Sequence, residues 1–176
     1  MSHETVVFDL DGTLVRLVVD WDAAARSVAE ALSERGVEPP TDLWAMLETA
    51  NETGHRDAVE TVLAQYEREG ARISERLPAA DTIPDGAVGV GVCSLNSEDA
   101  CRIALERHDL LETVATVVGR DTVATEKPNP EPLLETIRRL EGEPERTLFI
   151  GDSRRDEVTA DRAGTEFVYV SDWLRA

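Results

Sequence analysis

The sequence predicts an α/β protein in which a parallel sheet of about five strands carries helices on both faces, with a small helical insertion after the first strand. Short apolar runs alternate with amphipathic helical segments over most of the chain, which is typical of parallel sheets covered on both sides. Residues 16–80 break this alternation, because their pattern is helical throughout. With 176 residues, 41% of them apolar, the chain can fill one hydrophobic core and a small subdomain. The order of elements indicates a Rossmann-like arrangement.

The strands are predicted from short runs rich in valine, isoleucine, phenylalanine and threonine. Continuous apolar runs of this kind are typical of strands that are buried on both faces. The five runs occupy residues 5–8, 88–93, 114–118, 147–150 and 166–170.

Amphipathic helices are predicted between the later strands. One runs from about Ser97 to His108, because Ser97 is a favourable N-cap and acidic residues follow it in the first turn. A short helix before the last strand ends at Gly164, which suits the left-handed conformation found after many helices. A further helix begins after Pro130. Its apolar face is expected to consist of Leu133, Leu134, Ile137 and Leu140.

Residues 16–80 are predicted to form a cap subdomain of three helices, and residues 1–15 and 81–176 a core domain. Thr41 is the expected N-cap of the second helix, and the third is expected to close near Gly70. Apolar side chains at helical spacing mark the buried faces. They are Trp21, Ala25, Val28 and Leu32, then Leu43, Trp44 and Leu47, then Val59, Leu63 and Tyr66. Both tryptophans are therefore expected to pack in the hydrophobic core.

The balance of charges argues against several classes of partner. The formal net charge is −18, and such a surface repels nucleic acid and anionic membranes. No apolar run is long enough to cross a bilayer and the first residues lack a secretory signal, so a cytoplasmic protein is expected. Lys127 is the sole lysine among the 18 basic residues. The excess of acid with so little lysine favours adaptation to high salt, where acidic repulsion is screened.

Cysteine and histidine give no sign of a metal centre or a disulfide framework. Cys93 and Cys101 are too few for either, and buried free thiols are expected. His3, His55 and His108 lack the spacing of metal ligands, which favours solvated or capping positions.

Groups of polar residues follow the first four predicted strands. In chain order these groups are Asp9-Leu10-Asp11-Gly12-Thr13, then Ser94, then Lys127-Pro128, then Gly151-Asp152 with Asp156. Each group alone has an ordinary explanation as a turn or a helix cap. Because the carboxyl ends of parallel strands line one crevice, where ligands bind, these residues are expected to converge.

The acids of these groups suit phosphoryl transfer assisted by a metal. Asp9 and Asp11 lie two residues apart, so one carboxylate can attack while the other handles a proton. Asp152 and Asp156 add hard oxygen ligands that, together with Asp9, suit Mg²⁺.

The basic and hydroxyl groups suit a phosphoryl group as ligand. Lys127 supplies a compact positive charge and Ser94 a hydroxyl donor, and both can stabilise the charge of a phosphoryl group during transfer. A sequence that uses arginine almost everywhere retains lysine at position 127, where a point charge is more suitable than a planar fork.

The order of these motifs resembles the haloacid dehalogenase (HAD) superfamily, and specifically its phosphatases with a helical cap after the first motif; the resemblance covers nearly the whole chain. It implies a Mg²⁺-dependent phosphatase acting on a small phosphorylated metabolite, with a phosphoglycolate-type substrate as the default. Asp9 would be the nucleophile that forms an aspartyl-phosphate. Asp11 would protonate the leaving group and then activate water; an acid here favours phosphate over halide chemistry, because halide leaves without a proton.

The resemblance also assigns the remaining motif residues. The expected phosphate-binding set is Ser94, Lys127, Gly12 and Thr13. The expected ligands of Mg²⁺ are Asp9, the backbone carbonyl of Asp11, Asp152 and Asp156, the last as a ligand or as support for one.

Two departures from the family pattern bear on these expectations. Leu95 occupies the place after Ser94 where asparagine is usual, and Asn96 stands one residue further on. The turn at residues 84–86 leads almost directly into the second strand, which leaves no room for the helix that relatives carry there. The exposed sheet face would then be covered by the cap helices or by a second subunit in a homodimer.

Two other functions use the same residues. A phosphomutase would hand the phosphoryl group to a sugar, and a non-catalytic member would only bind phosphate or a partner. Four arginines of the insertion could meet an anionic substrate, although surface ion pairs are the commoner role; they are Arg56, Arg68, Arg72 and Arg76. Arg154 and Arg155 belong to the fourth motif and are expected near the site.

Overall fold

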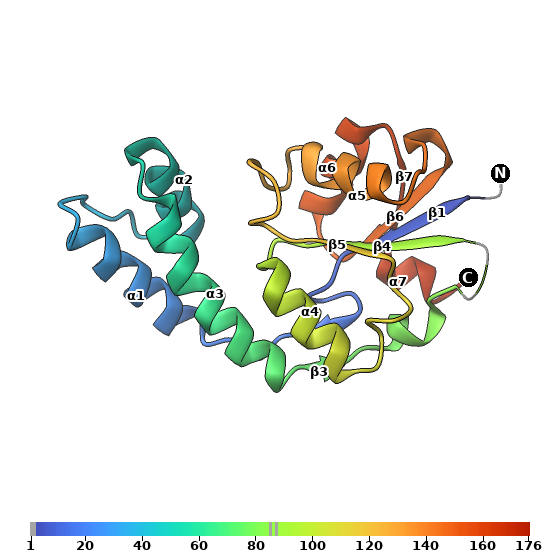
Figure 1. Ribbon diagram of the computed structural model, residues 1–176, viewed down its shortest axis with the longest axis horizontal. Coiled ribbons are helices and arrows are strands. Elements are labelled where there is room, and N and C mark those ends of the chain that lie inside the picture. The colour runs from blue at the N-terminus through green and yellow to red at the C-terminus, as the bar shows by residue number, and fades with distance from the viewer. Residues whose placement is uncertain (1–2, 85, 87) are drawn as a thin grey trace.

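The computed structural model describes residues 3–84, 86 and 88–176 and confirms the predicted class of fold (Figure 1). Five parallel strands form one sheet in the order β5-β4-β1-β6-β7. They are β1 (Thr5–Phe8), β4 (Gly89–Cys93), β5 (Thr116–Val118), β6 (Thr147–Gly151) and β7 (Glu166–Tyr169). The chain passes from β1 to β4 on one side and returns to β6 on the other, so the order of strands reverses beside β1. This is where α/β sheets bind their ligands.

Helices cover both faces of the sheet. Because successive side chains of a strand point to opposite faces, β1 contributes apolar side chains to the hydrophobic layer on each side. The helices are α4 (Glu98–Arg107), α5 (Glu131–Arg139), α6 (Arg154–Ala163), α7 (Val170–Trp173) and the short 3₁₀ helices η1 (Pro78–Thr82) and η2 (Pro144–Arg146). Val6 and Phe8 pack with residues of α4 on one face, whereas Val7 packs with residues of α5 and α6 on the other. Figure 1 shows these helices on opposite sides of the strands.

The local signals for the ends of two helices are confirmed. The Ser97 side chain accepts the backbone N–H of Ala100 at the start of α4, and Gly164 ends α6 with a φ of 76°. The apolar face of α5 is partly different from the prediction. Leu133 is buried, but Leu134 is exposed, because adjacent residues of a helix point about 100° apart and only one of them can face the sheet.

The sheet face beside β4 packs against other parts of this chain, including Ala71 of the segment predicted as the cap, and the expected cover by a second subunit stays a prediction. The helix η1 brings Ala79 into the same apolar cluster as the residues of β4 and α4. The C-terminal helix α7 closes over η1, where Trp173 Nε1 donates a hydrogen bond to Thr82 Oγ1 at 2.7 Å. Residues 85 and 87, in the short approach to β4, lie outside the described residues.

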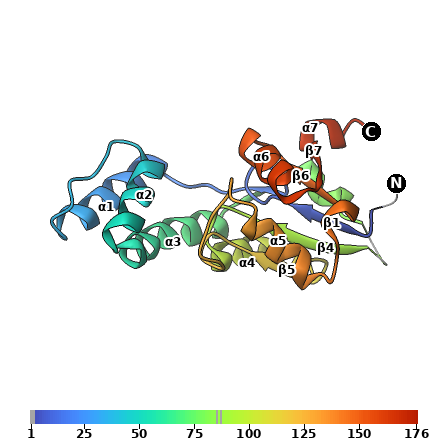
Figure 2. The ribbon, with the colours of Figure 1, turned by 90° about the horizontal axis from the view of Figure 1, so that it is seen from above.

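Three helices occupy the segment that the sequence marks as an insertion: α1 (Trp21–Ser33), α2 (Leu43–Thr53) and α3 (Arg56–Arg72). We call them the helical insert. They share a small apolar cluster of their own that contains Val28, Leu32 and Leu47. Figure 2 shows the helical insert at one end of the molecule, away from both termini. Its status as a separate cap domain stays a prediction.

One predicted end within the helical insert is wrong, and the end predicted near Gly70 lies two residues further on. Asp42, not Thr41, caps α2, because the Asp42 carboxylate accepts the N–H groups of both Trp44 and Ala45. Gly70 lies inside α3, which continues to residue 72. A Cβ at Gly70 would come within 2.8 Å of the Val18 carbonyl oxygen. The glycine therefore serves a close approach of the backbone rather than the end of a helix.

A short antiparallel pair that the sequence did not indicate joins the two ends of the helical insert. β2 (Val15–Arg16) pairs with β3 (Glu75–Arg76), with Arg16 opposite Glu75. Two-residue strands are too short for any periodic pattern. The chain therefore leaves the sheet for the helical insert and returns from it at adjacent positions.

Both cysteines are free and buried, as predicted. Burial raises the pKa of Cys93 to about 12, so this thiol stays protonated and packs as a small apolar group. Among the described residues, no helix has both the length and the apolar character that a bilayer crossing requires.

Candidate active site

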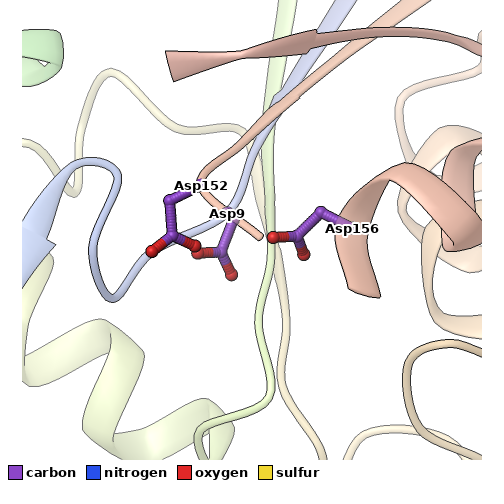
Figure 3. A group of neighbouring side chains, drawn as sticks. All are labelled: Asp9, Asp152 and Asp156. Carbon is purple, nitrogen blue, oxygen red and sulfur yellow. The ribbon is translucent and has the colours of Figure 1, made fainter. Parts of the chain in front are cut away.

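Three carboxylates converge at the carboxyl edge of the sheet (Figure 3). Asp9 directly follows β1, Asp152 follows β6, and Asp156 lies in the first turn of α6. One oxygen of each carboxylate lies within 4.8 Å of the other two, and Figure 3 shows the side chains pointing toward one another. Asp9 and Asp156 are buried whereas Asp152 is exposed, so the cluster opens to solvent on the side of Asp152.

The loop after β1 holds Asp9 in place. Its backbone N–H donates to the Ile150 carbonyl at 2.8 Å, and its Oδ2 accepts a hydrogen bond from Thr13 Oγ1 at 3.3 Å. Gly12 turns the loop with a φ of 89°, and a Cβ there would collide with the carboxylate of Asp152. Gly12 therefore leaves room for the Asp152 carboxylate, and Thr13 holds the Asp9 carboxylate in place.

The fourth motif explains why Asp156 points into the cluster. Asp156 and Ser153 form a capping box at the start of α6, in which the Ser153 hydroxyl donates to Asp156 Oδ2 at 2.6 Å. A Cβ at Gly151 would lie 2.7 Å from the Asp156 Cβ, so only glycine lets the helix start this close to β6. Asp156 is thus both the partner of the N-cap Ser153 in the capping box and a residue of the acidic cluster.

Lys127 lies fully inside the acidic cluster. Its ammonium Nζ donates to Asp9 Oδ1 at 2.8 Å, to Asp156 Oδ1 at 2.5 Å and to the Cys93 carbonyl oxygen at 3.1 Å. Burial opposes the charged form, but the two carboxylates outweigh it and raise the pKa of Lys127 above its usual value. Lys127 is therefore a fixed positive charge whose three donors are directed at Asp9 and its surroundings.

The cluster carries more negative charge than Lys127 can balance. Burial raises the pKa of Asp9 to about 7; Lys127 opposes this shift, while Asp156 and Asp152 add to it. Burial, followed by the charge of Asp156, also raises the pKa of Asp152. Three carboxylates with hard oxygen donors around one ammonium fit a divalent cation such as Mg²⁺. The predicted ligands Asp9, Asp152 and Asp156 are the residues that could hold it.

Asp11 lies beside the cluster and is not part of it. Its Oδ1 accepts the backbone N–H of Leu17 at 2.8 Å, and the residue lines the pocket next to the cluster. Burial raises the pKa of Asp11; the Leu17 N–H opposes the shift and the charge of Asp152 adds to it. A carboxyl group that holds its proton more tightly than usual suits a general acid.

A pocket of about 360 Å³ lies between the acidic cluster and the helical insert. Its wall on the insert side is largely apolar and consists of Trp21, Leu43, Trp44, Leu47 and Leu63, together with Glu67 of α3. The expectation that both tryptophans pack in the core is wrong, since Trp21 is 40% and Trp44 39% exposed. Leu47 and Leu63 belong to the buried apolar cluster of the helical insert, whereas Trp21 and Trp44 lie at its edge and form the exposed part of this wall.

A buried ion cluster that was not predicted from the sequence joins the helical insert to the loops at the edge of the sheet. Arg120 follows β5 and its guanidinium contacts the carboxylates of Glu60 and Glu67 on α3, at 2.9 Å and 2.5 Å respectively. Arg120 also donates to the Leu95 carbonyl oxygen at 2.7 Å. Arg120 and Glu67 are fully buried. The position of Arg120 just after a strand was a usable signal, whereas nothing distinguished the two glutamates from the other acids of a helix.

The structure places Ser94 beneath the pocket rather than in its lining. Ser94 is buried, and its hydroxyl donates to Asn96 Oδ1 and accepts the Asn96 backbone N–H, both at 3.1 Å. Asn96 itself lines the pocket, and its amide donates to Glu67. The polar group presented to the pocket in this loop is therefore Asn96. The phosphate-binding role of Ser94 stays a prediction.

Three of the four arginines noted in the insertion form ion pairs, as expected of surface residues. Their partners are Glu126 for Arg56, Asp99 for Arg68 and Asp81 for Arg76. Arg155 of the fourth motif does line the pocket, as its position predicted.

Fold and site together define a class: a parallel α/β protein whose acidic centre lies at the carboxyl edge of the sheet and faces a helical insert. The model of the haloacid dehalogenase-like hydrolase family matches residues 6–170. The chain belongs to this family of enzymes, as its motifs predicted.

Relatives match almost the full length of the chain. A phosphoglycolate phosphatase of Cereibacter sphaeroides is 31% identical over 192 residues, covering 97% of this chain and 86% of the relative. The pyrophosphatase PpaX of Oceanobacillus iheyensis is 25% identical over 189 residues, covering 97% and 85%. The crystal structure of a HAD-superfamily hydrolase from Geobacter sulfurreducens is 26% identical with a TM-score of 0.64, and the match covers 96% of this chain and 89% of that one.

Proposed function

We propose that this chain is a Mg²⁺-dependent phosphatase that hydrolyses a small phosphorylated metabolite of the phosphoglycolate type through an aspartyl-phosphate on Asp9. The contact between Asp9 and the Lys127 ammonium within the acidic cluster carries this proposal. It puts a carboxylate nucleophile next to a fixed positive charge, which is the pairing that attack on an anionic phosphoryl group requires. The similarity to a phosphoglycolate phosphatase supports the substrate class.

In the first half of the reaction, a carboxylate oxygen of Asp9 attacks the phosphorus atom and the bond from phosphorus to the leaving oxygen breaks. Asp11 gives its proton to that oxygen, so the leaving group departs as an alcohol. Its raised pKa favours the protonated form that this step needs. Lys127 balances the charge on the phosphoryl oxygens while the bonds change.

In the second half, a water molecule attacks the phosphorus of the aspartyl-phosphate and gives its proton to Asp11. The bond from phosphorus to the Asp9 oxygen breaks, which releases inorganic phosphate and restores the Asp9 carboxylate. Asp11 ends protonated again, so both acids return to their starting states. One acid thus serves as the proton donor and then as the base, as microscopic reversibility demands of a shared site.

Asp9, Asp152 and Asp156 would hold Mg²⁺, with the Asp11 carbonyl as the further ligand that the family resemblance implies. When bound, the ion supplies electrostatic stabilisation of the transferring phosphoryl group. Its charge also offsets the excess of carboxylates, which lets Asp9 ionise and attack at neutral pH.

Hydrolysis of p-nitrophenyl phosphate is expected to require Mg²⁺ and to disappear with EDTA. Asp152→Asn should raise the Mg²⁺ concentration needed for half-maximal activity by about tenfold or more, because it removes one negative ligand. Asp161→Asn, which removes an exposed carboxylate from the neighbouring helix α6, is the control and should leave the Mg²⁺ dependence unchanged. Equal activity with and without Mg²⁺ would contradict the proposal. Isomerisation of a hexose 1-phosphate without phosphate release would identify a mutase instead.

Lys127→Arg is expected to reduce kcat/KM by at least about tenfold, equivalent to about 1.4 kcal/mol. Lys127 fills a buried position between Asp9 and Asp156, and a planar guanidinium cannot direct compact donors to both carboxylates and a phosphoryl oxygen. Steady-state kinetics with phosphoglycolate measure the effect, and the melting curve shows that the variant is folded. A Lys127→Arg enzyme with the wild-type kcat/KM would exclude the proposed role of the lysine.

A further inference from the structure

We propose that Arg155 and Trp44 form a subsite for a carboxylate carried by the leaving group of the substrate. The preferred substrate is then a short phosphomonoester with a second anionic group, and not a sugar phosphate. This inference rests on the proposed phosphatase function and specifies the part of the pocket that selects the substrate.

Arg155 is the cation of the pocket that is available to the leaving group of a substrate. Three basic side chains line the pocket: Arg120, Lys127 and Arg155. Lys127 is held by two aspartates of the acidic cluster, and Arg120 by two glutamates of α3. Within the part of the chain that the structure describes, Arg155 has no carboxylate at ion-pair distance, although its neighbour Arg154 pairs with Glu157.

Trp44 fixes the orientation of Arg155. The Arg155 guanidinium carbon lies 4.4 Å from the centroid of the Trp44 ring, which is a cation–π contact. A guanidinium that rests one face on an aromatic ring keeps the N–H groups of its edge free, and these groups match a carboxylate with two parallel hydrogen bonds. Because the ring already restricts the arginine, little side-chain freedom is lost when an anion binds.

The location of this pair suits a leaving group whose phosphoryl end is at the acidic cluster. Arg155 lies one residue before Asp156 on α6, and Trp44 reaches the pocket from α2 of the helical insert. The pair therefore bridges the side of the pocket that carries the acids and the side that carries the apolar wall. A ligand that spans the cluster and this pair has the Lys127 ammonium near its phosphoryl end and the Arg155 guanidinium near its other end.

The remaining wall argues against a sugar as leaving group. Leu43, Leu47 and Leu63 offer no hydrogen-bond partners, and the polar groups of Glu67 and Asn96 are engaged with Arg120 and with each other. Several sugar hydroxyls would lose water there without gaining hydrogen bonds in return, which disfavours their binding. A carboxylate on a short carbon chain meets Arg155 and places its methylene group against the leucines.

The first experiment measures binding alone and is independent of turnover. The two ligands are 3-phosphonopropionate, which mimics phosphoglycolate with a non-hydrolysable carbon linkage, and propylphosphonate, which has a methyl group in place of the carboxylate. With Mg²⁺ present, calorimetry is expected to show that the wild-type protein binds 3-phosphonopropionate about tenfold more tightly. Arg155→Met should abolish this preference. Arg154→Met is the matched control, because the Arg154 side chain is 83% exposed, and it should keep the preference.

The second experiment separates the subsite from the phosphatase proposal. In Arg155→Met, the ratio of kcat/KM for phosphoglycolate to kcat/KM for p-nitrophenyl phosphate should fall about tenfold, mainly through KM, and in Arg154→Met it should not change. An unchanged ratio in Arg155→Met, or equal binding of the two phosphonates by the wild type, overturns the subsite while the phosphatase stands. A wild-type protein that hydrolyses neither ester yet prefers 3-phosphonopropionate overturns the phosphatase while the subsite stands.

Discussion

Asp9→Asn is expected to abolish turnover and the formation of a phosphoenzyme, because the amide cannot act as the nucleophile that the mechanism requires. The measurement is the release of phosphate together with trapping of labelled protein from a phosphorylated substrate. Asp11→Asn is the informative partner. It leaves the nucleophile intact, so it should slow turnover strongly but still accept a phosphoryl group from an ester with a good leaving group. Wild-type activity in Asp9→Asn would refute the mechanism.

The loss of activity in Asp9→Asn will not come from loss of fold. Burial raises the pKa of Asp9 to about 7, whereas an aspartate in an unfolded chain ionises near a pH of about 4. Between these values the folded state binds the proton more tightly, so the ionised carboxylate destabilises the fold increasingly as the pH rises through this window. Asparagine carries no such charge. In EDTA at about pH 8, well above this window, Asp9→Asn should melt at the wild-type temperature or above it; a lower melting temperature would contradict this account.

Arg120→Met is expected to lower the free energy of unfolding by about 3–5 kcal/mol, the range for breaking a buried ion pair by removing one partner. Methionine keeps the unbranched, apolar part of the side chain but leaves the carboxylates of Glu60 and Glu67 without their counter-charge, and Glu67 is fully buried. Urea unfolding measures the change. Activity should fall as well, because Arg120 joins α3 of the helical insert to the loops that line the pocket.

Two further variants test this explanation. Arg102→Met breaks the exposed pair with Glu98 on α4 and should change stability by less than about 1 kcal/mol. Glu67→Gln added to Arg120→Met should recover part of the lost stability, since it removes the uncompensated charge. An Arg120→Met protein that unfolds at the wild-type urea concentration would show that the ion cluster does not hold the helical insert in place.

The fold was predictable where local chemistry decides the structure. The apolar run at residues 5–8 must be buried on both faces, and it is the central strand. Ser97 and Gly164 end their helices by hydrogen bonding and backbone geometry that need only nearby residues. Gly70 misled the prediction because its role comes from the backbone of Val18, which lies far from it in the sequence. Such contacts leave no mark in a pattern of apolar residues.

The site was predictable to the extent that topology alone brings residues together. Parallel strands end at one edge, so the acids at positions 9, 152 and 156 had to be neighbours. The contact of Arg120 with Glu67 depends instead on how α3 is placed against the loops after β4 and β5. For the same reason, the apolar stripe of a helix does not indicate which of its residues pack in the hydrophobic core and which border the pocket. Trp44 lies on the stripe of α2 but borders the pocket.

The pairing of β2 with β3 bears on how this architecture can evolve. Arg16 and Glu75 lie opposite each other, so a tight turn could connect them and leave the path of the sheet unchanged. The entropic cost of closing this loop rises only slowly with the length of the intervening chain. The three helices can therefore be exchanged, enlarged or lost as one unit. A replacement insert must also pack against the core, which the pairing of β2 with β3 does not ensure. Because Arg120 pairs with two glutamates of α3, a replacement insert needs carboxylates at equivalent places, or a substitution of Arg120, in order to pack beside the pocket.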